Sequence, residues 1–206
     1  MYKVHTEDKI IKLLLENRKE FTIRSIANII KVDYKTVHIK VDELAKQGII
    51  SIKKAGQSSL CSINNILHPS ILRAEYIRTN DLLKNKNMYV LYNRIKEINP
   101  FFILLLFGSH ASKTNKKESD IDLMLISDIK TEKIQKIITG IPLKIHLLKF
   151  TTEEFSKMLK TTEFNVGKEA ANNNVILFGI ENYYRLIENA GPKKSYRSAE
   201  QYAQVS

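Results

Sequence analysis

The sequence predicts an α+β protein built in two parts, and three observations lead to this class. Residues 1–64 show the apolar spacing of short helices, followed by two short apolar runs around a glycine turn. Residues 89–190 instead alternate strand-length apolar runs with helical patterns, which favours a layered α/β domain with a small mixed sheet. Residues 65–88 are expected to form a helical connector, and a polar tail covers 191–206.

The first part should contain three helices and a hairpin. The first helix, in "EDKIIKLLLEN", is expected to place on one face Ile10, Leu13, Leu14 and Asn17. Thr22 is the expected N-cap of the second helix, in "FTIRSIANIIKV". The third, in "VDYKTVHIKVDELAKQGII", should begin after the N-cap Asp33 and stop at Gly48. The runs "IISIKK" and "SLCSI" then read as two strands around the turn "AGQS".

This order of elements is that of a winged helix-turn-helix, and "TIRSIANIIKVDYKTVHIKVDELAKQGIISIKK" resembles the winged helix-turn-helix family of prokaryotic regulators. The second helix of such a motif lies in the major groove of DNA. The resemblance therefore implies a transcription regulator that binds double-stranded DNA through Lys35, Thr36, His38 and Lys40 of the helix and Lys53 and Lys54 of the hairpin. The alternative use of such a segment is protein contact or dimerisation, with a homodimer as the result.

Composition is compatible with a DNA partner but does not establish one. The formal net charge of +11 favours a polyanionic partner. Alternatively, the positive charge reflects codon composition and no partner, because a chain rich in Lys, Ile and Asn accumulates surface lysines when it is encoded by an AT-rich genome. The single cysteine, Cys61, excludes an intrachain disulfide and is expected to be a packed residue of the hairpin.

No apolar run reaches the length of a membrane span, since the longest is "FFILLLF". The opening "MYKVHTEDKI" lacks the apolar core of a signal peptide. We therefore expect a cytoplasmic protein with no membrane partner.

The second part should alternate helices and strands. We expect helices in "MYVLYNRIKEI", "TEKIQKIITG" and "TTEEFSKMLK", and strands in "FFILLLF", "DIDLMLIS" and "PLKIHLLKF". A loop or short helix should follow Gly108, and "NVILFGIENYYRLIENA" should give a short strand and a last helix. Tyr183 and Tyr184 of that helix are expected to pack in the core.

The stretch "FGSHASKTNKKESDIDL" carries the residues with a chemical role. A strand that ends at Gly108 and Ser109 and turns into a helix exposes backbone N–H groups, which suit a phosphate. Asp120 and Asp122 lie two positions apart on a strand, so both carboxylates should project from one face and attract Mg²⁺. A metal beside a phosphate site is the minimum for nucleotidyl transfer.

Phe107, Gly108 and Ser109, the ten residues 110–119 and then Asp120-Ile121-Asp122 resemble the signature of the nucleotidyltransferase superfamily, in its minimal form found in many archaea and bacteria. The resemblance spans roughly residues 89–190. It implies a nucleotide site at Gly108 and Ser109, and a catalytic and metal-binding role for Asp120 and Asp122. The implied cofactors are Mg²⁺ or Mn²⁺ and a nucleoside triphosphate, with ATP expected. Minimal members often act as antitoxins, which implies a helical toxin-type protein partner.

The sequence departs from this pattern at the third carboxylate, which active members usually carry on the next strand. In "PLKIHLLKF" His146 stands there, with Lys144 and Leu148 on the same face. Histidine is a poor Mg²⁺ ligand. The acids nearest in sequence, Asp128, Glu153 and Glu154, should lie at element ends. The favoured interpretation is a DNA-binding regulator with weak or lost transfer activity. One alternative is an active enzyme that moves a nucleoside monophosphate onto a protein or small molecule, and another is a scaffold that binds neither DNA nor nucleotide. The loop lysines Lys113, Lys116 and Lys117 either steer nucleotide phosphates or are simply solvated.

Overall fold

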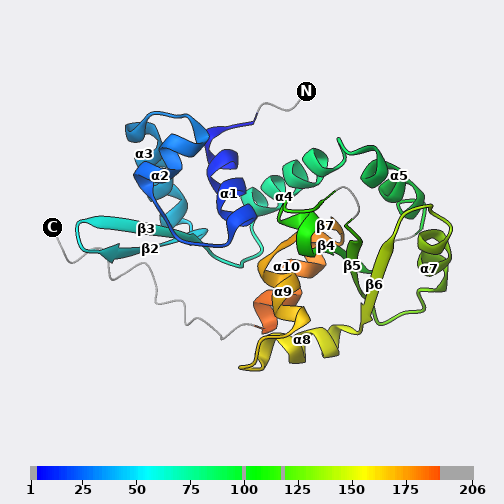
Figure 1. Cartoon of the computed structure of the whole chain (residues 1–206). Coiled ribbons are helices and arrows are strands. Elements are labelled where there is room, and N and C mark those ends of the chain that lie inside the picture. The colour runs from blue at the N-terminus through cyan, green and yellow to red at the C-terminus, as the bar shows by residue number, and fades with distance from the viewer. Residues whose placement is uncertain (1–3, 99–100, 117–118, 191–206) are drawn as a thin grey trace.

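The computed structural model describes residues 4–98, 101–116 and 119–190 of the chain, so the predicted polar tail lies outside the described residues. The described part is a mixture of helices and two small sheets (Figure 1). None of its helices is both long enough and apolar enough to cross a membrane. The predicted α+β class is confirmed.

The three helices and the hairpin of the first part follow one another as expected from the sequence, with one additional short strand. Its elements are α1 (Thr6–Asn17), β1 (Phe21–Thr22), α2 (Ile23–Ile30), α3 (Tyr34–Lys46), β2 (Ile50–Ala55) and β3 (Ser58–Ile63). The Thr22 hydroxyl accepts a hydrogen bond from the backbone N–H of Ser25, and the Asp33 carboxylate accepts one from Thr36, so both predicted N-caps are confirmed. The strand β1 was not predicted, because two residues carry no periodicity. It pairs with β3 and gives the sheet order β1-β3-β2.

Helix α1 buries a wider stripe than expected, and Asn17 is not part of it. Ile10 and Leu14 are in the core as predicted, but Ile11 and Leu15 join them. Asn17 is exposed and donates a hydrogen bond from its side chain to the carbonyl of Leu13. The buried stripe is wider than the sequence suggested because α1 packs against α2 and α3 on one side and against α4 (Pro69–Leu82) on the other.

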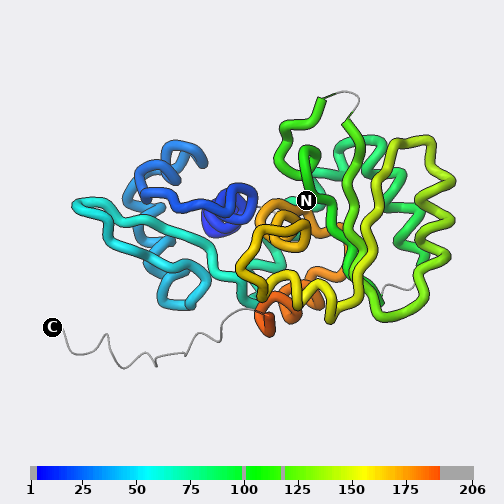
Figure 2. The backbone as a smooth tube through the Cα atoms, turned by 60° about the horizontal axis from the view of Figure 1, so that its bottom comes forward, coloured from blue at the N-terminus to red at the C-terminus, as the bar shows by residue number. Residues whose placement is uncertain are grey.

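The second part is a four-stranded mixed sheet with helices on both faces (Figure 2). Its elements are α5 (Lys86–Ile95), β4 (Ile103–Phe107), α6 (Gly108–Ala111), β5 (Ile121–Ile126), α7 (Glu132–Thr139), β6 (Ile145–Phe150), α8 (Thr152–Lys160), α9 (Val166–Asn172), β7 (Asn174–Phe178) and α10 (Ile180–Ala190). The strand order is β6-β5-β4-β7, with β5 and β6 parallel and the other pairs antiparallel. Helix α9 was not predicted, because it is short and carries no apolar stripe.

Side-chain alternation gives the sheet two buried faces. On one face, residues such as Leu104 and Leu123 pack with α5 and α7. On the other, residues such as Leu105 and Met124 pack with Phe155 of α8 and with α10. A polar residue on either face can therefore be accessible only at the ends of the strands, beyond the covering helices.

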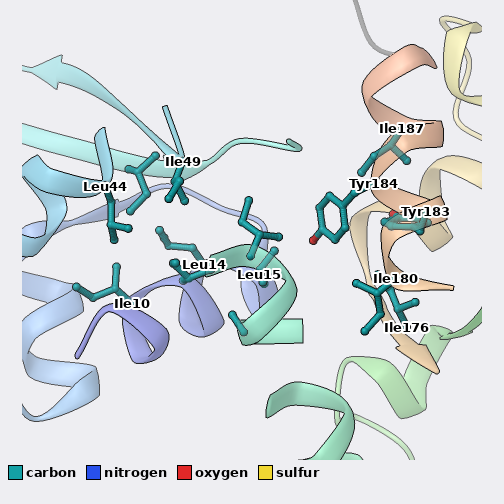
Figure 3. Packing of buried hydrophobic residues seen from close by; sticks show 14 of the residues in the cluster. Ile10, Leu14, Leu15, Leu44, Ile49, Ile176, Ile180, Tyr183, Tyr184 and Ile187 are labelled. Atoms are coloured by element: carbon teal, nitrogen blue, oxygen red, sulfur yellow. The ribbon is translucent and has the colours of Figure 1, made fainter. Parts of the chain in front are cut away.

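The two parts share one core. The apolar cluster that contains Leu14 and Leu15 of α1 continues through α4 to Tyr183 and Tyr184 of α10 (Figure 3). Both tyrosines are fully buried, as predicted for packing residues. Burial, followed by the nearby carboxylate of Glu75, raises the pKa of Tyr184 well above its usual value.

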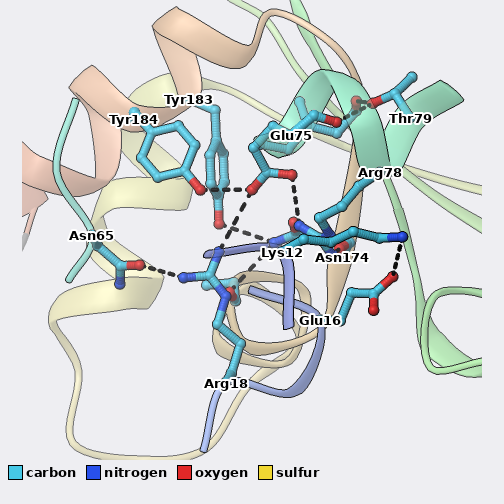
Figure 4. Close-up of polar contacts among 12 residues, drawn as sticks. Lys12, Glu16, Arg18, Asn65, Glu75, Arg78, Thr79, Asn174, Tyr183 and Tyr184 are labelled. Carbon is cyan, nitrogen blue, oxygen red and sulfur yellow. Dashed lines mark hydrogen bonds and ion pairs between the residues drawn. The ribbon is translucent and has the colours of Figure 1, made fainter. Parts of the chain in front are cut away.

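A buried polar network crosses the same junction (Figure 4). The carboxylate of Glu75 on α4 accepts hydrogen bonds from Arg78 at 2.6 Å and from the Tyr184 hydroxyl at 2.6 Å. Arg18, directly after α1, lies 4.0 Å from the same carboxylate. Arg78 in turn donates to the backbone carbonyl of Asn174, where β7 begins. The predicted connector therefore contains a helix with a structural role in both parts.

Candidate nucleotide site

The Gly-Ser turn and the second aspartate are in direct contact. Strand β4 ends at Phe107, which lies opposite Asp122 of β5 in the antiparallel register. Gly108 follows with a φ of +66°, and a Cβ atom at this position would lie 2.6 Å from Oδ2 of Asp122. Only glycine leaves room for that carboxylate and adopts this backbone conformation without strain. The local sequence thus fixes the carboxylate against the turn.

The turn itself is held by polar side chains. The carbonyl of Gly108 accepts hydrogen bonds from the Ser112 hydroxyl at 3.2 Å and from the Asn173 amide at 3.1 Å. The helix that begins here, α6, has only four residues. Its dipole is therefore slight, and any anion held at Ser109 depends on individual backbone N–H groups more than on a long helix.

Asn173 was not identified from the sequence. It lies 65 positions after Gly108 along the chain, just before β7, which pairs with β4. The run "NNN" at residues 172–174 was the available signal, because it places three amide side chains in succession just ahead of the apolar run "VILF".

The two aspartates are placed almost as expected. Asp122 lies on β5 with 29% of its side chain exposed, whereas Ile121 and Leu123 are buried on the opposite face. Strand β5 begins at Ile121, so Asp120 lies directly before the strand and not on it, and it is exposed. Both acids are therefore accessible near the start of β5, although Asp122 only in part.

His146 occupies the place where a third acid was sought. In the parallel pairing of β5 and β6 it lies beside Asp122, and its Nδ1 atom is 3.4 Å from Oδ1 of Asp122. Its side chain is 60% exposed, whereas Ile145 and Leu147 pack toward the other face. The predicted orientation of His146 toward the aspartates is thus confirmed for Asp122.

The remaining acids near this strand have other roles. The carboxylate of Asp128 accepts hydrogen bonds from the hydroxyl and the backbone N–H of Thr152, which lower its pKa. Glu154 forms a capping box with Thr151, and Glu153 pairs with Lys157. Asp128 follows the far end of β5, and the other two belong to α8, so none of these acids completes the site.

The donor set fits a cation that arrives with phosphates. The described residues contain no group of three or more His, Cys, Asp or Glu side chains that could hold a metal ion. Mg²⁺ is commonly bound by one or two carboxylates together with substrate phosphates. Asp120 and Asp122 match that mode, whereas they are too few for a metal site made by the protein alone.

The loop lysines differ from one another. Lys113 has a positive φ of 58°, and its amine lies 3.0 Å from Glu16 of α1, so it is partnered across the junction of the two parts. The backbone N–H of Lys116 donates to the Ser119 hydroxyl at 2.8 Å, while its side chain is exposed. Lys117 lies outside the described residues.

The predicted DNA-contacting residues on α3 are exposed to different degrees. Val37, Val41 and Leu44 form the buried stripe. Lys35 is exposed, and Thr36 is half-buried. His38 is exposed but pairs with Asp42 at 3.1 Å, and Lys40 pairs with Glu43 at 2.6 Å. These acids partly neutralise the expected groove face, which the sequence pattern did not reveal.

The two lysines predicted to contact DNA from the hairpin are both exposed to solvent. Lys53 and Lys54 are exposed on β2 near its tip, and neither takes part in an ion pair within the described chain. Behind them, Cys61 of β3 is fully buried, and burial raises the pKa of its thiol to about 11. The cysteine is therefore an unreactive packing residue, as expected.

Residues 91–178 match the family model described as the nucleotidyltransferase domain. No curated protein matches the chain significantly. Among solved structures the chain is similar to TrmBL2, described as an archaeal chromatin protein with a novel mode of DNA binding, at 14% identity over 77% of this chain and 66% of that one. This chain thus spans just under two thirds of TrmBL2, and the TM-score of 0.26 is too low to support an argument. The segment that contains Gly108, Asp122 and His146 lies within the residues that match the nucleotidyltransferase domain model.

Proposed function

We propose that the protein is a DNA-binding transcription regulator whose nucleotidyltransferase domain binds a metal–nucleotide complex and has weak or no transfer activity. The observation that carries the proposal is the contact of Asp122 with Gly108 on one side and with His146 on the other. The first contact supports a preformed site for a cation and phosphates. The second supports loss of transfer, because an imidazole replaces the third carboxylate.

In this proposal the residues have separate roles. Backbone N–H groups at Gly108 and Ser109 would hold phosphate oxygens, and Asp120 and Asp122 would bind Mg²⁺ or Mn²⁺ that accompanies ATP. When bound, the metal supplies charge neutralisation at the phosphates. Without a strong general base, nucleotidyl transfer should be roughly a hundred- to ten-thousand-fold slower than in an enzyme that has one.

Isothermal titration calorimetry with ATP and Mg²⁺ tests the nucleotide site. We expect the double variant Asp120→Ala, Asp122→Ala to lose metal-dependent nucleotide binding. It should remain folded, because the change removes the repulsion between two carboxylates that lie two positions apart in the chain. The matched control is Glu153→Ala with Glu163→Ala, which removes the same charge from two exposed positions of the same domain. Equal affinity of the wild type and the aspartate variant would refute the site.

The DNA-binding role is proposed for residues 1–64, with 65–88 as connector and 89–190 as the nucleotide-binding domain. It is supported by the order of three helices and a hairpin, and by the exposed amines of Lys35, Lys53 and Lys54. We expect duplex binding that weakens steeply with salt, because each phosphate contact releases counterions.

Variants separate general contacts from base reading. Lys53→Ala should weaken binding to all sequences alike, whereas His38→Ala should change sequence preference. Lys157→Ala, on α8 of the other part, is the control and should leave binding unchanged. A titration by fluorescence anisotropy that finds no duplex affinity at low salt would refute the DNA-binding role.

The second candidate is an active nucleotidyltransferase that moves a nucleoside monophosphate onto a protein or small molecule, as an antitoxin acting on a helical toxin partner would. The family match and the two retained aspartates favour it. Incubation with radiolabelled nucleoside triphosphates, Mg²⁺ or Mn²⁺ and candidate acceptors distinguishes the two. Robust transfer by the wild type that Asp122→Ala abolishes would establish this candidate and exclude the first.

A further inference from the structure

Helix α3 presents an apolar side chain at the middle of its outer face. Ile39 is 48% exposed and points away from the buried stripe formed by Val37, Val41 and Leu44. Single exposed apolar residues are common on protein surfaces and need no explanation by themselves. Ile39 differs in its position, because it lies on the face of α3 left free by α1, α2 and β2.

The charges around Ile39 favour a polyanion over an apolar protein surface. Lys35 lies one turn earlier on the same side of α3 and is not part of an ion pair within the described chain. Of the acids in the next turn, Glu43 pairs with Lys40 at 2.6 Å, and Asp42 lies 3.1 Å from His38, which offsets its charge only when protonated. The outer side of α3 therefore offers Ile39 and one cation outside any ion pair of the described residues, Lys35, while the Asp33 carboxylate before the helix accepts a hydrogen bond from the backbone N–H of Thr36.

We infer that Ile39 reads the methyl group of thymine, so that the protein prefers duplexes with thymine at the position that α3 contacts. This inference rests on the proposed DNA-binding role of residues 1–64. In the major groove the 5-methyl group of thymine is the only apolar group that a base edge presents. An isoleucine side chain has no hydrogen-bonding group, so against any other base edge it would desolvate polar atoms without replacing their bonds.

The expected effect follows from the size of the contact. Burial of one methyl-sized group between two apolar surfaces changes affinity by about fourfold. Replacement of thymine by deoxyuridine removes this methyl group and keeps the base pair. We therefore expect the wild type to bind a deoxyuridine-substituted AT-rich duplex about fourfold more weakly than the same duplex with thymine.

Fluorescence anisotropy at low salt with this pair of duplexes measures the effect, and variants assign it to one side chain. Ile39→Ala should bind both duplexes equally, with an affinity close to that of the wild type for the deoxyuridine duplex. Ile29→Ala is the matched control, because Ile29 on α2 is 51% exposed but lies off α3. It should keep the fourfold difference.

Each other outcome overturns the inference in a recognisable way. Strong duplex binding that does not distinguish thymine from deoxyuridine, or a difference that survives in Ile39→Ala, rejects thymine reading and leaves the DNA-binding role intact. Absence of duplex binding by the wild type rejects both. A dimer in analytical ultracentrifugation that Ile39→Ala dissociates assigns Ile39 to an interface between two copies of the chain.

Discussion

Gly108→Ala should damage the nucleotide site more than it damages the fold. The backbone cost is that of a left-handed conformation for a residue with a Cβ, about 1–2 kcal/mol, since φ is +66°. The new Cβ would also lie 2.6 Å from Oδ2 of Asp122, so the carboxylate must rotate away. That atom is the end of a partly exposed side chain, and an off-rotamer position costs about 1 kcal/mol.

A matched glycine separates these two costs. Gly56, in the hairpin turn, has a φ of +59° but no atom within 4 Å of an added Cβ. Gly56→Ala should therefore show the backbone cost alone, and Gly108→Ala should exceed it by about 1 kcal/mol in urea unfolding at constant m-value. In an Asp122→Ala background the excess should vanish, because the obstructing oxygen is gone.

Ligand binding should respond more strongly than stability. Displacement of Asp122 removes one of the two carboxylates proposed to bind the metal. Charge-assisted contacts of this kind contribute about 1.5–3 kcal/mol, or roughly ten- to a hundredfold in affinity for Mg²⁺-ATP by calorimetry. The reasoning is wrong if Gly108→Ala and Gly56→Ala destabilise equally in both backgrounds and Mg²⁺-ATP affinity is unchanged.

Three further variants address other parts of the molecule. His146→Asp should raise nucleotidyl transfer from absent or very slow to measurable in a radiolabel assay; robust wild-type transfer that no change at His146 affects would contradict this. Burial raises the pKa of Asp81, but hydrogen bonds from Lys12 and Lys84 outweigh burial and lower it. The contribution of Asp81 to the free energy of unfolding is therefore present above the unfolded pKa of about 3.9 and is lost as pH falls through the lower folded pKa. Asp81→Asn should flatten the pH dependence of the free energy of unfolding in that acidic window, and an unchanged profile would reject this prediction. Glu75→Gln should destabilise by about 3–5 kcal/mol in urea unfolding, because it leaves Arg78 buried without its counter-charge; wild-type stability would show that the network contributes little.

Local chemistry made much of the fold predictable from the sequence. Thr22 and Asp33 cap helices through contacts within three residues, and Gly108 and Asp122 belong to a single hairpin-like pair of strands. The failures depend on distant contacts. Whether Asn17 or Leu15 of α1 is buried depends on α4, which no periodicity within α1 reveals. Asn173 reaches Gly108 only because β7 pairs with β4. The sequence shows acids near His38 and Lys40, but it does not show that Asp42 and Glu43 lie within pairing distance of them.

The junction changes how the two parts should be understood. A loosely linked pair of domains would bury separate cores, yet Leu15 of α1 and Tyr184 of α10 belong to one apolar cluster, and Glu75 between them is fully buried. Glu16 of α1 also holds Lys113, which follows the Gly-Ser turn by a few residues. We therefore interpret the boundaries near residues 64 and 88 as divisions between roles and not between folding units. Helix α1 packs on α3, and its Glu16 pairs with Lys113 in the loop after the Gly-Ser turn, so this ion pair is one contact through which a displacement of that loop can act on α1. Since that pair is exposed, it contributes no more than about 1 kcal/mol, which limits any coupling it carries to roughly fivefold.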